Sequence, residues 1–134
     1  MILYTIGVNL IAPFTITPSG PCRREPGTYF YGYEIKSSNY PDSYDPNEDC
    51  TWTIRTNSGK GIELQFLDFD TEADHDSLRI YDGDSSSYAQ IGNQLSGSLL
   101  PGTVVSSGSE LHLRWSSDSR IQRKGFKIKL GTYG

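Results

Sequence analysis

Apolar and polar residues alternate in several short segments of this chain, and clusters of Gly, Pro, Asn, Asp and Ser separate these segments. The alternation is clearest at residues 51–54, 62–66, 78–80, 111–115 and 126–130. A period of two places successive side chains on opposite faces, as in a β-strand with one face in a core. No ten-residue window carries the i, i+3, i+4, i+7 apolar spacing of a helix. We therefore expect an all-β chain, folded as an antiparallel sandwich or barrel.

Size and charge exclude several classes of function. The 134 residues are enough for one domain, and 12 Lys and Arg against 16 Asp and Glu give a net charge of −4 without a basic cluster. Nucleic-acid binding is not expected, because it needs a basic stripe. No apolar run reaches the roughly 20 residues of a membrane span. There is no Gly-rich phosphate loop and no HExxH motif, and no serine sits in the context of a nucleophile elbow, so we do not expect an enzyme.

The N-terminus is the most apolar segment of the chain, and it too has a period of two. Pro13 removes one ladder donor, so the sequence predicts an edge strand or a strand in two parts. We expect residues 1–20 to form an extended strand and hinge, separate from a domain at 21–134. The apolar face of this strand comprises Ile2, Tyr4, Ile6, Val8, Leu10, Phe14 and Ile16.

Such a strand is longer than the domain beside it. Fifteen or sixteen extended residues reach about 50 Å, whereas a domain of this size is roughly 36 Å across. We therefore expect the strand to pair with a neighbouring copy, which would produce a homo-oligomer or a polymer, closed as a ring or open as a filament. The alternatives are a segment folded along its own domain and the boundary of a fragment from a larger mosaic protein.

Several motifs follow one another between Cys22 and about Leu130, namely Cys22, 32–41 (GYEIKSSNYP), Tyr44, 50–54 (CTWTI), 66–72, 76–83 (DSLRIYDG), Ser117-Asp118 and Gly125-Phe126. In these motifs and their order the chain resembles the CUB domain family. The resemblance implies a jelly-roll-like antiparallel β-sandwich of about ten strands, found in secreted, extracellular, non-enzymatic interaction proteins. It also implies a disulfide between Cys22 and Cys50, which suits an oxidising compartment, while Ala73 and Ser96 stand where the family commonly has a second pair.

The same resemblance implies a calcium site. Matched residue by residue, its ligands fall on Glu72, Asp76 and Asp118, completed by oxygens near Ser119 and Arg120 and by water. Ca²⁺ requires six to eight oxygen ligands, and loop carboxylates supply the charged ones. The segment from Glu72 to Asp76 is shorter than in calcium-binding members, and His75 replaces the usual Tyr. Solvated carboxylates without an ion are the alternative, and the candidate substitute ligands are Asp68, Asp70 and Asp74.

Two classes of function follow. In the first, the chain is a structural subunit that assembles through its N-terminal strand and is stabilised by calcium. In the second, it is a monomeric calcium-dependent adhesion or ligand-recognition module that binds a protein or a glycan. In that case we expect the acidic loops to capture a Lys or Arg of the partner. The expected contact residues are Tyr81, Asp82, Asp118 and Ser119.

Overall fold

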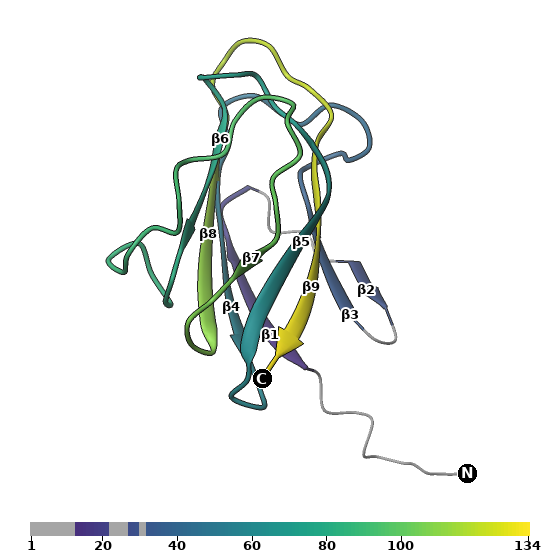
Figure 1. Ribbon diagram of the computed structural model, residues 1–134. Coiled ribbons are helices and arrows are strands. Elements are labelled where there is room, and N and C mark those ends of the chain that lie inside the picture. Colours follow the sequence, from purple (N-terminus) through teal and green to yellow (C-terminus); the bar gives the residue numbers. More distant parts are fainter. Residues whose placement is uncertain (1–12, 22–26, 30–31) are drawn as a thin grey trace, which may run out of the picture.

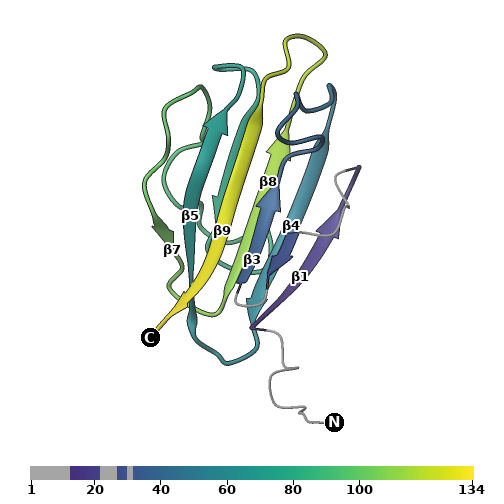
Figure 2. The ribbon, with the colours of Figure 1, turned by 90° about the vertical axis from the view of Figure 1, so that its right-hand side faces the viewer.

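The computed structural model describes residues 13–21, 27–29 and 32–134, which form two antiparallel sheets packed face to face (Figure 1). One sheet has the strand order β1-β4-β8-β6 and the other the order β2-β3-β9-β5-β7, whose β7, β5, β9 and β3 lie side by side in Figure 2. The predicted all-β sandwich is thus confirmed. The strands are β1 (Phe14–Ser19), β2 (Gly27–Tyr29), β3 (Gly32–Lys36), β4 (Asp49–Thr56), β5 (Gly61–Asp70), β6 (Ser77–Tyr81), β7 (Val104–Val105), β8 (Glu110–Ser116) and β9 (Gly125–Tyr133).

Aromatic side chains link the two sheets in the core. The ring of Phe126, on β9, lies 5.1 Å from that of Trp115 on β8 and 6.0 Å from that of Trp52 on β4, both in edge-to-face geometry. Such contacts add about 0.5–1.5 kcal/mol each beyond their buried area. All five segments with alternating residues lie within strands, and their apolar residues form this core because they face inward.

The alternation shifts by one residue within β5. The register against β9 is irregular between Phe66 and Asp68, and Leu67 at this bulge is exposed. Phe66 and Phe69 therefore both face the core although they are three residues apart. A bulge of this kind re-aims the side chains that follow it.

Strand β1 corrects the prediction made for the end of the N-terminal segment. Phe14 to Ser19 pair with β4 of the same chain, from Phe14 opposite Thr56 to Ser19 opposite Thr51. Phe14 is 4% exposed and makes an edge-to-face contact with Tyr33 of the other sheet, and Ile16 packs against the same core. These two side chains therefore bury their surface within their own domain, not against a neighbouring copy, and the sandwich begins before residue 21.

The loops β3–β4 (37–48), β5–β6 (71–76) and β8–β9 (117–124) meet at one end of the sandwich, at the top of Figure 1. We call this the loop end. The C-terminus lies at the opposite end. Among the described residues, no helix has the length and apolar character needed to cross a membrane.

Replacing Phe14 tests whether β1 belongs to the domain. We expect Phe14→Ala to lower the free energy of unfolding by about 3–5 kcal/mol, because it removes a buried ring that bridges the two sheets. Thr17→Ala, on the exposed face of the same strand, is the control and should change stability little. The measurement is denaturant unfolding, and equal small effects of the two substitutions would show that β1 contributes little to the core.

Candidate cation site at the loop end

A buried carboxylate joins the three loops of the loop end. Asp76 is 0% exposed, and its Oδ2 accepts a hydrogen bond of 2.5 Å from the hydroxyl of Tyr44 in the β3–β4 loop. Its Oδ1 accepts a hydrogen bond of 2.8 Å from the backbone N–H of Asp118 in the β8–β9 loop. Burying a carboxylate is costly unless such donors surround it. Asp76 therefore fixes where Tyr44 and Asp118 lie.

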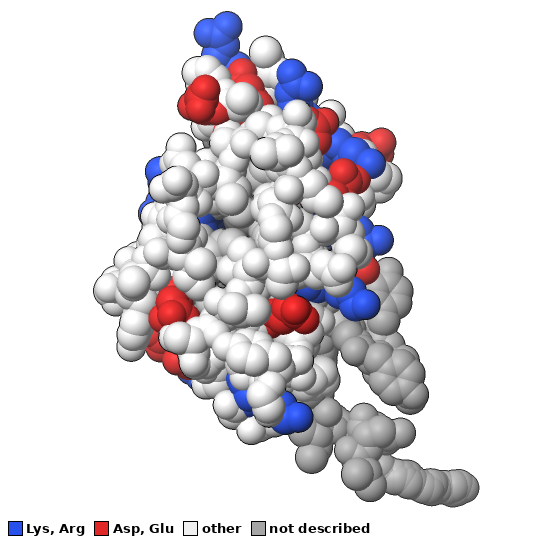
Figure 3. Space-filling view, in the orientation of Figure 1, with Lys and Arg blue, Asp and Glu red and all other residues white. Residues whose placement is uncertain are grey.

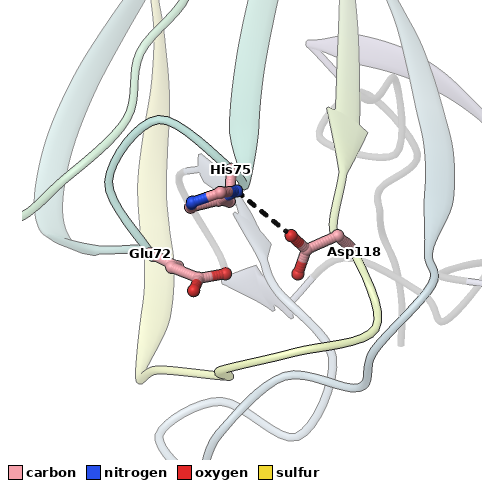
Figure 4. A group of neighbouring side chains, drawn as sticks. All are labelled: Glu72, His75 and Asp118. Carbon is pink, nitrogen blue, oxygen red and sulfur yellow. Dashed lines mark ion pairs between the residues drawn. The ribbon is translucent and has the colours of Figure 1, made fainter.

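Glu72, His75 and Asp118 point toward one another beside this junction (Figure 4). One ligand atom from each lies within 4.8 Å of the others, and His75 Nδ1 is 3.4 Å from Asp118 Oδ2. The backbone of the short β5–β6 loop brings Glu72 and His75 to the same side, since the N–H of His75 donates to the carbonyl of Glu72. These three side chains form the cation cluster.

The two carboxylates of the cation cluster differ in environment. Glu72 is 8% exposed, and its Oε1 is buried without a hydrogen-bond partner. Burial, and then the negative charge of Asp118, raise the pKa of Glu72. Asp118 is one-third exposed, and the backbone N–H of Arg120, which donates to its Oδ1 at 3.0 Å, lowers its pKa. The cluster therefore combines a partly exposed acid whose pKa is lowered with a buried acid whose pKa is raised.

Ser96 holds the β5–β6 loop where the family commonly has its second disulfide. Its hydroxyl accepts a hydrogen bond from the N–H of Asp74 at 2.9 Å. The same hydroxyl lies 2.7 Å from the carbonyl oxygen of Asp76 and 3.1 Å from that of Glu72. Hydrogen bonds thus connect this serine to the loop that carries Ala73.

The predicted metal ligands are only partly brought together. Glu72 and Asp118 converge, and His75, which the sequence singled out only as a departure from the family, joins them. Asp76 lies directly behind the cation cluster with both of its oxygens already accepting hydrogen bonds, so its role as a direct ligand stays a prediction. The substitutes do not enter the cluster. Asp68 instead forms an ion pair of 2.5 Å with Lys124.

Two of the four predicted partner contacts lie elsewhere. Tyr81 ends β6, whose first residue is next to Asp76, and its ring packs beside His112. Asp82 accepts hydrogen bonds from the N–H and the hydroxyl of Ser107, in the loop between β7 and β8. Five residues of strand therefore carry Tyr81 and Asp82 away from the loop end. Ser119, in contrast, is exposed directly beside Asp118.

Several predicted residues lie outside the described part of the chain. Cys50 is fully buried and disulfide-bonded, but its predicted partner Cys22 is not among the described residues. The predicted partner-binding residues before Pro13 lie outside it as well, namely Ile2, Tyr4, Ile6, Val8 and Leu10.

Tyr44 was not predicted as a site residue, although it belongs to a motif of the family. Its side chain is 1% exposed, its ring packs edge-to-face on Trp115 at 4.8 Å, and its hydroxyl accepts a hydrogen bond from the N–H of Glu72. The sequence shows a tyrosine in a polar loop. Only the structure shows that its hydroxyl is hydrogen-bonded both to the Asp76 carboxylate and to the N–H of Glu72.

The antiparallel sandwich and the geometry of its loop end can be compared with those of known proteins. The family model of the CUB domain matches residues 24–130. Tolloid-like protein 2 of Mus musculus is 39% identical over 97 residues, and cubilin of Homo sapiens is 38% identical over 96 residues. These matches cover 69% and 72% of this chain, but 10% and 3% of the two relatives. The chain belongs to the CUB domain family.

A solved structure of the full extracellular region of zebrafish Gpr126/Adgrg6 contains a similar fold. It matches this chain with a TM-score of 0.60 and 28% sequence identity. The match covers 75% of this chain and 13% of that one. This chain thus corresponds to a small part of much longer proteins.

Removing the hydroxyl of Tyr44 tests the junction at Asp76. We expect Tyr44→Phe to lower the free energy of unfolding by about 2–3 kcal/mol, because it leaves Asp76 Oδ2 and the Glu72 N–H buried without this partner. Tyr40→Phe is the matched control. Tyr40 donates to Asp68, which keeps its ion pair with Lys124, so its loss should cost about 1 kcal/mol or less. Equal losses in denaturant unfolding would contradict this role of Tyr44.

The raised pKa of Glu72 predicts a pH-dependent effect of Glu72→Gln in chelator. An acid whose folded pKa is raised favours the folded state at low pH, and this contribution disappears as the pH rises through the folded pKa. Glutamine does not ionise, so the variant should melt at a higher temperature than the wild type at pH 7. The difference should vanish below about pH 4. A variant that melts lower at pH 7 would mean that the Glu72 charge is stabilised without a cation.

Proposed function

We propose that this chain is an extracellular, non-enzymatic interaction module whose loop end binds Ca²⁺ and presents acidic side chains to a basic group of a partner protein. The observation that carries the proposal is the buried Glu72 Oε1, which has no hydrogen-bond partner and belongs to a carboxylate that converges on Asp118. The disulfide at Cys50 supports an oxidising compartment. The similarity to part of an extracellular region supports the same location.

The residues present fit a calcium ion. Ca²⁺ prefers carboxylate and carbonyl oxygens, and Glu72 and Asp118 offer two carboxylates without a basic partner from Lys or Arg among the ion pairs of the described residues. Asp118 is one-third exposed, so water has access to complete the ligand shell. Bound calcium would supply positive charge, which offsets the burial and the repulsion by Asp118 that together raise the pKa of Glu72.

The partner contact is proposed on the exposed side of the same loops. Asp118, Ser119 and Asp74 are accessible there, and Figure 3 shows both acidic and basic side chains at this end, at the top of the view. A Lys or Arg of a partner would form charge-assisted hydrogen bonds with the exposed carboxylates. Such contacts contribute specificity and fast association more than bulk affinity.

Calorimetric titration of Ca²⁺ into the full chain tests the proposal. We expect one site, with binding weakened by roughly tenfold or more in Glu72→Gln and in Asp118→Asn, because each change removes a charged ligand. Asp68→Asn is the matched control, since Asp68 is paired with Lys124 outside the cation cluster, and it should bind Ca²⁺ as the wild type does. Undiminished binding in both cluster variants would place the site elsewhere.

A second candidate function, self-assembly through the N-terminal segment, is supported by the end of the β1–β4 ladder. Phe14 pairs with Thr56, the last residue of β4, and the N–H of Asn57 donates to the carbonyl of Pro13. The turn to β5 follows directly. Among the residues that the structure describes, the four-stranded sheet therefore has no strand opposite the positions that precede Pro13. We propose that this segment pairs with a neighbouring copy, in a head-to-tail contact that forms a ring or a filament.

Charge substitutions on the two faces of this segment test self-assembly in the full chain. Ile6→Asp with Val8→Asp places charge on the apolar face, whereas Thr5→Asp with Asn9→Asp places the same charge on the polar face. We expect light scattering to detect oligomers for the wild type and the polar-face control, and a monomer for the apolar-face variant. A monomeric wild type, or equal masses for all three, would refute this assembly.

A further inference from the structure

The imidazole of His75 gives the cation cluster a nitrogen ligand. Nδ1 of His75 faces Asp118 in Figure 4, where it lies 3.4 Å from Asp118 Oδ2, and the Glu72 carboxylate lies beside this pair. Ca²⁺ prefers oxygen ligands, so a calcium site does not require this nitrogen. Zn²⁺, in contrast, binds histidine nitrogen together with Asp or Glu oxygen.

The spacing of the cluster suits a small tetrahedral ion. In a zinc site with bonds of about 2.0–2.1 Å, adjacent ligand atoms are about 3.3–3.4 Å apart. The distance between His75 Nδ1 and Asp118 Oδ2 has this value, and all three ligand atoms lie within 4.8 Å of one another. Only a modest approach of Glu72 would complete three corners of a tetrahedron.

Two of the three ligands are held in place by the fold. The backbone N–H of Asp118 donates to the buried Asp76, and Asp118 Oδ1 accepts from the N–H of Arg120, so Oδ2 is the oxygen that faces His75. Glu72 is more than nine-tenths buried, and its Oε1 has no hydrogen-bond partner. Ligands oriented by their surroundings in this way favour metal binding.

We propose that His75 extends the cation site from calcium to transition-metal ions of the zinc class. The three protein ligands are His75 Nδ1, Glu72 and Asp118, and water occupies the fourth position. The proposal rests on the proposed function insofar as both ions use the same two carboxylates. It differs in that calcium does not require His75, and each ion excludes the other because the carboxylates are shared.

Calorimetric titration of Zn²⁺ into the full chain, freed of metal by a chelator, tests this inference. We expect one zinc per chain for the wild type, and binding weakened roughly tenfold or more in His75→Asn. The matched control is His112→Asn. His112 lies on β8 with its Nδ1 2.9 Å from the hydroxyl of Thr53, and its loss should leave zinc binding unchanged. The absorption spectrum of bound Co²⁺ provides a second readout, because its bands should show a tetrahedral nitrogen–oxygen site that His75→Asn removes.

Calcium titrations of the same proteins separate this inference from the proposed function. We expect His75→Asn to bind Ca²⁺ as the wild type does, which also shows that the variant is folded, and we expect added Ca²⁺ to weaken zinc binding. Zinc binding that is absent in the wild type, unchanged in His75→Asn, or lost in His112→Asn would overturn the inference. Zinc binding without calcium binding would refute the proposed function alone, and absence of both would refute the site itself.

Discussion

The hydrogen bonds of the Asp76 carboxylate are the interaction on which the loop end depends. A buried charge without donors would cost several kcal/mol, and here the donors come from two loops that are 32 and 42 residues away in sequence. The same hydroxyl of Tyr44 that donates to Asp76 also accepts from the N–H of Glu72. One buried group therefore sets the positions of Glu72 and Asp118 together, and the cation cluster is a consequence of how Asp76 is satisfied.

This arrangement leaves an electrostatic cost in the domain without a cation. Glu72 is buried beside Asp118, and its pKa is raised by that burial and by the neighbouring charge. Polar groups held at such a cost are typical of binding sites, where a ligand offsets them. The loop that carries Glu72 is nevertheless fixed at its other side by Ser96, which contacts three backbone groups. The fold thus supports the cluster from two directions while leaving Glu72 Oε1 available.

Much of the fold could be predicted from alternation, because each strand buries one face. Phe14 and Ile16 show the limit of this method. They have the same alternation as the apolar residues before Pro13, and a period of two does not show which sheet a strand will join. The strand predicted at 78–80 already implies that Asp76 and Asp82 lie at opposite ends of it, whereas the position of Asp118 beside Asp76 required the structure. His75 was visible as a departure from the family. Its proximity to Asp118, which makes it a ligand candidate, depends on the fold of the β5–β6 loop.

The most direct test of the central claim, that a cation site is built on the Asp76 junction, is a crystal structure of the full chain grown with Ca²⁺. The account predicts an ion bound by carboxylate oxygens of Glu72 and Asp118. It also predicts that the hydrogen bonds from Tyr44 and from the N–H of Asp118 to Asp76 are retained. Contact between Glu72 and Asp118 without an ion, in crystals that hold Ca²⁺ at another place on the chain, would contradict it.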